Sequence, residues 1–123
     1  MPTVLDPFLS LLQQGLSFQK EGQLKAAEEM YRQVVQQAPR HAMAWHLLGT
    51  VAGQQGRKWD AVSHLQQSLQ LYPGDPTAWK NLASAFQDIG EYAHARSAAE
   101  RALALRPDYH GARLVWATSS TAL

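Results

Sequence analysis

Apolar and polar residues alternate along this chain with the spacing of an α-helix, and the whole pattern returns at a fixed distance. Pro39, Pro73 and Pro107 each stand 34 residues from the next. A period of this size is typical of repeat architectures. In a frame of 34 residues the chain divides into an N-terminal extension (1–7), three units (8–41, 42–75 and 76–109) and a C-terminal segment (110–123).

Each unit contains two amphipathic stretches separated by a glycine. Mostly apolar or small residues occupy unit positions 4, 7, 8 and 11, which share one face of a helix. Glycine at position 15 can adopt the positive φ that ends this helix, and the proline at position 32 stops a second one. The pattern predicts helix, tight turn, helix in every unit, with helices over 8–20, 24–37, 42–54, 58–71, 76–88 and 92–105.

A seventh helix is expected from about residue 109 to 118, and it is an imperfect copy of a first helix. Its positions 4 and 7 hold Arg113 and Trp116. Two interpretations remain open, a terminal cap that covers the third unit and the start of a further repeat.

Small residues at positions 8 and 20 predict where the paired helices approach most closely, because a bulky side chain there would push the helix axes apart. The expected facing pairs are Gly15 with Ala27, Gly49 with Ala61, and Ala83 with Ala95.

The sequence resembles the tetratricopeptide repeat family. In the second unit the residues that carry the resemblance are Trp45, Leu48-Gly49, Ala61 and Pro73, and most of this spacing returns in the other two units. The resemblance implies an all-α fold. It is an α-solenoid in which three helix-turn-helix repeats and a seventh capping helix form a right-handed superhelix.

By the same resemblance, the first helix of each unit lines a concave groove that receives a peptide or a segment of another protein. The N-terminal part of this face is apolar, which favours contact with a partner, although the segment Pro2–Asp6 is an alternative cover. The predicted groove residues are Leu9, Leu12, Leu16, Met43, His46, Leu47, Thr50, Lys80, Asn81, Ser84 and Gln87.

Chaperone-type members of the family clamp a terminal carboxylate with Lys and Asn in the first unit and Lys and Arg in the third. The corresponding positions hold Leu12 and Leu16 in the first unit, and Thr77 and Asn81 in the third. The resemblance therefore does not imply an acidic C-terminal peptide as the ligand.

Composition narrows the classes of partner. The formal net charge is +1 and the charges are spread along the chain, so we expect no nucleic acid partner. The chain has no cysteine, which fits a reducing compartment, and we expect a cytoplasmic protein. The first residues show neither a basic segment nor a long apolar run, which predicts no signal peptide and no membrane insertion.

No catalytic or metal-binding pattern stands out. The five histidines form no i, i+4 pair, so we expect no enzyme activity, no cofactor and no metal site. Trp45 and Trp79 are expected in the core. Trp59 and Trp116 fall outside the pattern, and either could belong to the core or to an interface.

Three functional hypotheses follow. The first is a non-enzymatic scaffold that binds a peptide or protein segment in its groove. The second is the N-terminal arm of a larger, transferase-type enzyme, because arrays that resemble this one can precede such domains. The third is a homo-oligomer, with the leucines of the first unit or the Trp116 end pairing two chains.

Overall fold

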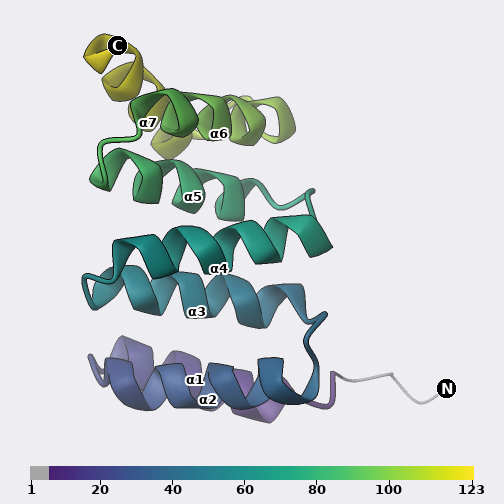
Figure 1. Cartoon of the computed structure of the whole chain (residues 1–123). Coiled ribbons are helices and arrows are strands. Elements are labelled where there is room, and N and C mark those ends of the chain that lie inside the picture. The colour runs from purple at the N-terminus through teal and green to yellow at the C-terminus, as the bar shows by residue number, and fades with distance from the viewer. Residues whose placement is uncertain (1–5) are drawn as a thin grey trace, which may run out of the picture.

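The computed structural model describes residues 6–123, and these form a stack of seven α-helices (Figure 1). The first six predicted helices agree with the structure to within one residue at each end, whereas the seventh extends four residues further than expected. The helices are α1 (Leu9–Lys20), α2 (Leu24–Gln37), α3 (Ala42–Gln54), α4 (Lys58–Leu71), α5 (Pro76–Asp88), α6 (Tyr92–Leu105) and α7 (His110–Ala122).

Of the predicted N-terminal extension, only Asp6 and Pro7 are described. The alternative in which Pro2–Asp6 covers part of the first unit concerns mainly residues 2–5, which lie outside the described residues. Asp6 accepts a hydrogen bond from the backbone N–H of Phe8 at 2.8 Å, just before α1 begins.

The turn inside each unit is made by a glycine with a left-handed backbone. Gly22, Gly56 and Gly90 have φ values of 80°, 82° and 81°, a region in which a side chain would be strained. The N–H of the next residue donates to a carbonyl five residues back, which ends the first helix of the unit. These bonds are Gln23 to Phe18 (2.8 Å), Arg57 to Ala52 (2.9 Å) and Glu91 to Phe86 (2.9 Å).

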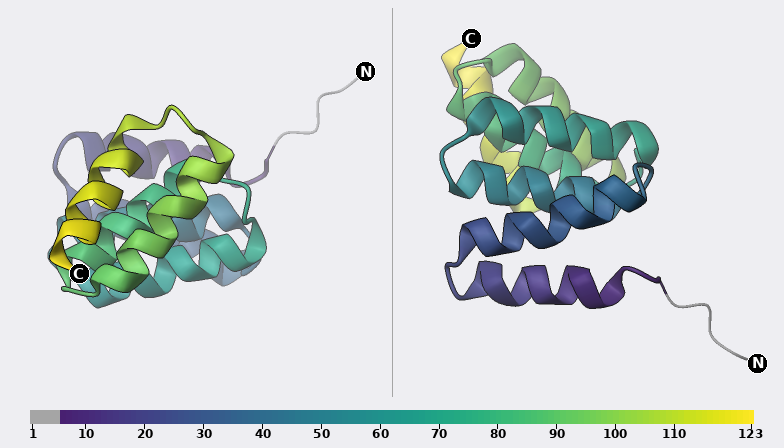
Figure 2. Two further views of the ribbon diagram at one scale, coloured as in Figure 1. Left: turned by 90° about the horizontal axis from the view of Figure 1, so that it is seen from above. Right: turned by 60° about the horizontal axis from the view of Figure 1, so that its bottom comes forward.

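The helix pairs α1/α2, α3/α4 and α5/α6 stack on one another, and α7 packs against α5 and α6. Seen from above, the C-terminal helices are inclined to the teal helices beneath them (Figure 2). No strand occurs between residues 6 and 123. The expected all-α solenoid is therefore confirmed.

The buried apolar side chains form two clusters that meet at α3. We call the cluster of α1, α2 and α3 the N-terminal core, and the cluster of α3 to α7 the C-terminal core. Leu48 and Val51 of α3 belong to the N-terminal core, whereas the adjacent Ala52 belongs to the C-terminal core. Residues of one helix thus belong to both clusters and join the first unit to the rest of the stack.

The expected partner of Gly15 was wrong. A β-carbon on Gly15 would overlap the ring carbon Cε1 of Tyr31, so the Tyr31 ring is nearer to this position than Ala27. Helical side chains lean toward the N-terminus of their helix, so position 24 covers the surface above position 20. Gly49 shows the same arrangement, since its β-carbon would lie 2.7 Å from Cγ of Leu65 and 3.3 Å from the carbonyl oxygen of Ala61.

Candidate interaction surface

Polar side chains join the first helices of successive units in a row. Gln19 of α1 donates to Thr50 of α3 at 3.4 Å and also to Gln54. Between α5 and α7, the Ser119 hydroxyl donates to Oε1 of Gln87 at 3.3 Å. We call this row of contacts on α1, α3, α5 and α7 the inner ladder.

The middle contact of the inner ladder is built around His46 of α3. Its Nε2 accepts from the Asn81 amide at 3.0 Å, and its Nδ1 donates to Oδ2 of Asp75 at 3.2 Å. Oδ1 of Asp75 also caps α5 by accepting from the backbone N–H groups of Thr77 (3.0 Å) and Ala78 (3.3 Å). One carboxylate therefore fixes both the start of α5 and the ring of His46.

The His46 imidazole is buried, and desolvation lowers its pKa below the usual value of 6.5 although the nearby Asp75 carboxylate acts in the opposite direction. A neutral imidazole has one donor and one acceptor, which are the two roles that the Asp75 and Asn81 contacts require. The joint between α3 and α5 thus uses the uncharged form of His46.

The predicted groove residues fall into three groups by burial. Leu9, Leu16 and Met43 are 41 %, 47 % and 48 % exposed. Leu12 and His46 are buried, so neither offers an accessible surface. Leu12 is only 5 % exposed and belongs to the N-terminal core, because it lies three residues before Gly15 on the face that packs against α2. The half-buried residues are Leu47, Thr50, Lys80, Asn81, Ser84 and Gln87.

The three exposed side chains form what we call the inner apolar stripe. Leu9 and Leu16 are seven residues apart on α1, and a spacing of seven keeps them on one face. Met43 of α3 occupies unit position 2, as Leu9 does in α1. Apolar side chains thus stand at equivalent places on two neighbouring first helices.

The tryptophans expected in the core lie at its edge. Trp45 and Trp79 are half-buried, and their indole N–H groups donate to the carbonyl oxygens of Pro39 (2.8 Å) and Pro73 (2.7 Å). Arg113, at the same position of the seventh helix, donates to the carbonyl of Pro107 at 2.9 Å. Arg113 therefore makes the hydrogen bond that Trp45 and Trp79 make in their units. The sequence pattern did not indicate this equivalence.

The other two tryptophans differ from each other. Trp59 at the start of α4 is 63 % exposed. Trp116 of α7 is half-buried against the C-terminal core, where it donates to Glu100 at 3.3 Å and carries the Arg96 guanidinium over its ring at 5.4 Å. Of the two, Trp59 is the one that is free to meet a partner.

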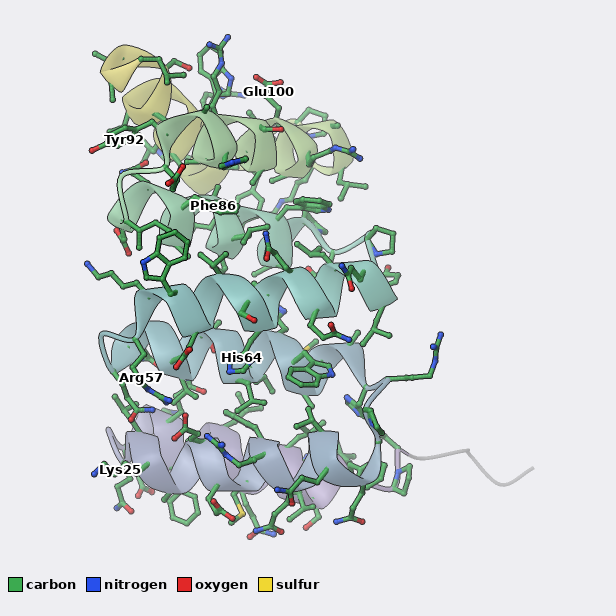
Figure 3. The ribbon with its side chains drawn as sticks, in the orientation of Figure 1. Lys25, Arg57, His64, Phe86, Tyr92 and Glu100 are labelled. Carbon is green, nitrogen blue, oxygen red and sulfur yellow. The ribbon has the colours of Figure 1, made fainter. Side chains whose placement is uncertain are left out.

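A cavity that the sequence analysis missed lies on the opposite side of the stack from the inner ladder. It is an open depression with a volume of about 570 Å³, lined mainly by residues of α4, α5 and α6. In Figure 3, Phe86 is labelled at the level of α5, between the ribbons of α4 and α6. A second cavity of about 330 Å³ shares Gln66, Phe86 and His94 with it, so the two form one continuous depression, which we call the outer groove.

Residues 6–123 show neither a candidate metal site nor a candidate membrane-spanning helix. This part of the chain brings together no group of three or more His, Cys, Asp or Glu residues able to hold a metal ion. None of the helices in the same range combines the length and the apolar character needed to cross a membrane.

The stacked two-helix units, turned by left-handed glycines, define a helical repeat protein. Family models described as tetratricopeptide repeat match residues 12–76 and 76–119. The chain therefore belongs to the tetratricopeptide repeat family.

Relatives show how much of a longer protein this chain resembles. The chain is 27 % identical over 96 residues to ER membrane protein complex subunit 2 of Xenopus tropicalis, which covers 78 % of this chain and 32 % of that protein. The chain thus spans about a third of the length of the curated relatives it matches.

Solved structures agree on the fold. A mutant O-GlcNAc transferase of Thermobaculum terrenum superposes with a TM-score of 0.85 at 30 % identity, over 91 % of this chain and 22 % of that chain. The first tetratricopeptide domain of Spaghetti (RPAP3), solved with an HSP90 peptide, gives a TM-score of 0.91 at 19 % identity, over 94 % of this chain and 91 % of that one.

Proposed function

We propose that the chain is a non-enzymatic interaction module whose inner face binds a peptide or a segment of another protein. The observation that carries the proposal is the inner apolar stripe, in which Leu9, Leu16 and Met43 are each more than two-fifths exposed. Apolar side chains gathered on one face of a small protein favour contact with a partner. The Spaghetti domain solved with an HSP90 peptide supports this use of the fold.

The inner ladder prepares this face for binding. Its hydrogen bonds hold α1, α3, α5 and α7 in register before a partner arrives, and a preformed surface loses less conformational entropy on binding. Apolar side chains of the partner would pack on the stripe. At the C-terminal end, Ser84 and Gln87 offer hydrogen bonds, and the Lys80 stem lies beside Gly111 of α7.

The proposed ligand is not an acidic C-terminus. A carboxylate clamp would need polar or basic side chains where this chain has the buried Leu12 and the exposed Leu16. A partner with apolar side chains matches this end of the face better.

Peptide selection followed by calorimetric titration tests the proposal. Random 12-residue peptides displayed on phage would be selected on the intact chain, and the enriched peptides titrated against a Leu16→Asp, Met43→Asp variant. We expect at least about a tenfold loss of affinity, because bound peptide would force a carboxylate into an apolar contact. The matched control is Leu114→Asp, a substitution of an exposed leucine on α7, which should leave affinity unchanged.

Circular dichroism of each variant separates lost binding from lost folding. If the double variant keeps its helicity and every selected peptide keeps its affinity, the inner face is not the binding site.

A larger enzyme is the second candidate. The 30 % identity to the Thermobaculum terrenum transferase over 22 % of that chain favours an arm of a longer protein. Coding sequence that continues from Leu123 into a transferase domain would support it.

Self-association is tested by light scattering across a dilution series. A constant monomer mass at all concentrations would exclude a homo-oligomer. The cytoplasmic location stays a prediction, which imaging of a tagged chain would check.

A further inference from the structure

The outer surface of the stack has two junctions where second helices of neighbouring units meet, and the two differ. At the α2/α4 junction, Arg57 forms an ion pair with Glu28. The ring of His64 stacks on Trp45 at a centroid distance of 5.6 Å. An ionic bridge therefore connects α2 to the start of α4, and beside it a ring of α4 covers the Trp45 ring of α3.

At the α4/α6 junction the equivalent positions carry residues that cannot make these contacts. Glu91 replaces Arg57 at unit position 16, and Val62 replaces Glu28 at position 21. Ala98 replaces His64 at position 23, so no ring covers Trp79 from α6 at this point. In their place, the Arg101 guanidinium lies over Trp79 and the His94 ring stacks on Phe86. The outer groove lies at this junction, where the ionic bridge is missing and Ala98 is smaller than the histidine at the same unit position.

The bottom of the outer groove is apolar and its rim is polar. Leu82 and Phe86 of α5, with Leu69 and Ala98, supply buried apolar surface, and the amides of Gln66 and Gln70 stand along α4. A volume of about 570 Å³ falls within the range of small-ligand and peptide pockets, roughly 300–1,000 Å³.

The charges of the outer groove differ between its two ends. Arg101 is the charged residue that lines the larger cavity, where its guanidinium lies over the Trp79 ring at 5.5 Å. It forms no ion pair with any residue from 6 to 123. Glu91 is the charged residue that lines the smaller cavity, beside the exposed Trp59. One end therefore attracts an anion and the other a cation.

We propose that the outer groove binds an extended segment of a partner protein that carries a carboxylate beside a large apolar side chain. The carboxylate pairs with Arg101, and the apolar side chain packs in the groove beside the Phe86 ring, on which the His94 ring of α6 stacks at a centroid distance of 5.2 Å. The amides of Gln66 and Gln70 are placed to bond the backbone of the segment. Arg101 and Trp79 stand at one end of the groove and Trp59 at the other. Arginine and tryptophan are enriched among residues that dominate binding energy.

The dimensions of the groove set the length and the direction of the segment. It follows α4, whose 14 residues make a helix about 20 Å long, and an extended chain of about six residues covers that distance. The acidic part lies toward Arg101, and a neutral or basic part lies toward Glu91. This site shares no residue with the inner apolar stripe, so it does not depend on the proposed function.

A peptide selection that compares the intact chain with a variant of reversed charge at Arg101 tests the outer groove. Random 12-residue peptides displayed on phage are enriched on the intact chain and depleted on an Arg101→Glu variant. The surviving peptides are synthesised, labelled with fluorescein and titrated by anisotropy. We expect them to contain Asp or Glu close to an aromatic or large aliphatic residue. We also expect at least about a tenfold weaker affinity for Arg101→Glu, because a charge-assisted hydrogen bond becomes a repulsion.

Three controls keep the result specific. Arg40→Glu makes the same change of charge at another exposed arginine and should leave the peptide affinity within about twofold of that of the intact chain. The Leu16→Asp, Met43→Asp variant of the inner face should also leave the affinity within about twofold. Arg101→Ala, which introduces no new charge, should also weaken binding, and circular dichroism should show unchanged helicity for all variants.

Several results would overturn the proposal. One is enriched peptides without acidic residues, and another is equal affinity for Arg101→Glu and the intact chain. Equal loss in Arg40→Glu would indicate a nonspecific charge effect, and loss only in the inner-face variant would assign the peptides to the inner face. A dimer in light scattering that Arg101→Glu dissociates would identify the occupant as a second copy of this chain instead of a partner protein.

Discussion

At the scale of single residues, the closest helix contact in the first unit depends on a missing side chain. Gly15 has no β-carbon, and the ring of the fully buried Tyr31 occupies that space. The Tyr31 hydroxyl then reaches Oε1 of Gln19 at 2.7 Å, so the same ring also supports the inner ladder. Burial raises the pKa of Tyr31 to about 12, which keeps this hydroxyl protonated and able to donate.

Gly15→Ala should therefore destabilise the chain. The new methyl group overlaps the Tyr31 ring, and overpacking of this kind costs about 1–3 kcal/mol. The matched control is Gly53→Ala, where the methyl would lie 3.7 Å from Cβ of Ala61 and should be neutral or stabilising by up to about 1 kcal/mol. Urea denaturation followed by circular dichroism measures both, and equal stability of the two variants would contradict the packing argument.

The sequence could predict some of these residues and not others. Glycine at position 15 of each unit indicated the helix ends, because no other residue adopts a positive φ at so little cost. The partner of Gly15 could not be read from spacing, since it depends on the direction in which the Tyr31 side chain leans. Leu12 was assigned to an exposed face, yet its unit position is buried in α1 and also in α3, where His46 occupies it. Burial at this position depends on the neighbouring helices, which the repeat pattern does not describe.

At the scale of helices, the joint between α3 and α5 is sensitive to pH. Burial lowers the pKa of His46, and burial also lowers the pKa of His64 at the α2/α4 junction. Between the folded pKa and the unfolded value near 6.5, the unfolded chain binds more protons than the folded chain. Acidification through this window therefore favours unfolding.

We expect the free energy of unfolding to fall as the pH is lowered from 7.5 to 5.5. A His46→Gln variant should show a smaller fall, because glutamine cannot take up the proton. Denaturation curves at several pH values give the slopes, and an identical slope for His46→Gln and the intact chain would show that this imidazole does not contribute.

Helices themselves were predictable, whereas the bonds between them were not. A 34-residue period with glycine and proline at fixed positions determines where each helix begins and ends. His46 and Asn81 are 35 residues apart, and Arg57 and Glu28 are 29 apart. Such pairs depend on how neighbouring helices align, which no local pattern contains. The outer groove depends on positions at which the units differ, whereas the repeat pattern shows only what they share.

At the scale of the whole molecule, the first unit is attached through one side of α3. Its core uses Leu48 and Val51 of that helix, while the C-terminal core uses Ala52. In α1 only Leu12 and Gly15 are buried, compared with five residues in α5. In stacked repeats each unit contacts only its neighbours, so a terminal unit can open alone.

Hydrogen exchange should reveal this difference. We expect backbone amides of α1 and α2 to exchange at least about tenfold faster than those of α3 to α5, because local opening of the first unit exposes less apolar surface than global unfolding. Mass spectrometry of peptides from each helix measures the rates. Equal protection of all helices would instead mean that the chain opens as one cooperative unit.

The contrast between the two outer junctions has a consequence for arrays of this type. Three side chains, at unit positions 16, 21 and 23, separate a sealed junction from an open one on nearly the same backbone. If the outer groove binds a partner as proposed, point mutation at these positions would add or remove a docking site without changing the number of repeats. The number of partners that such an array holds would then not be set by its length.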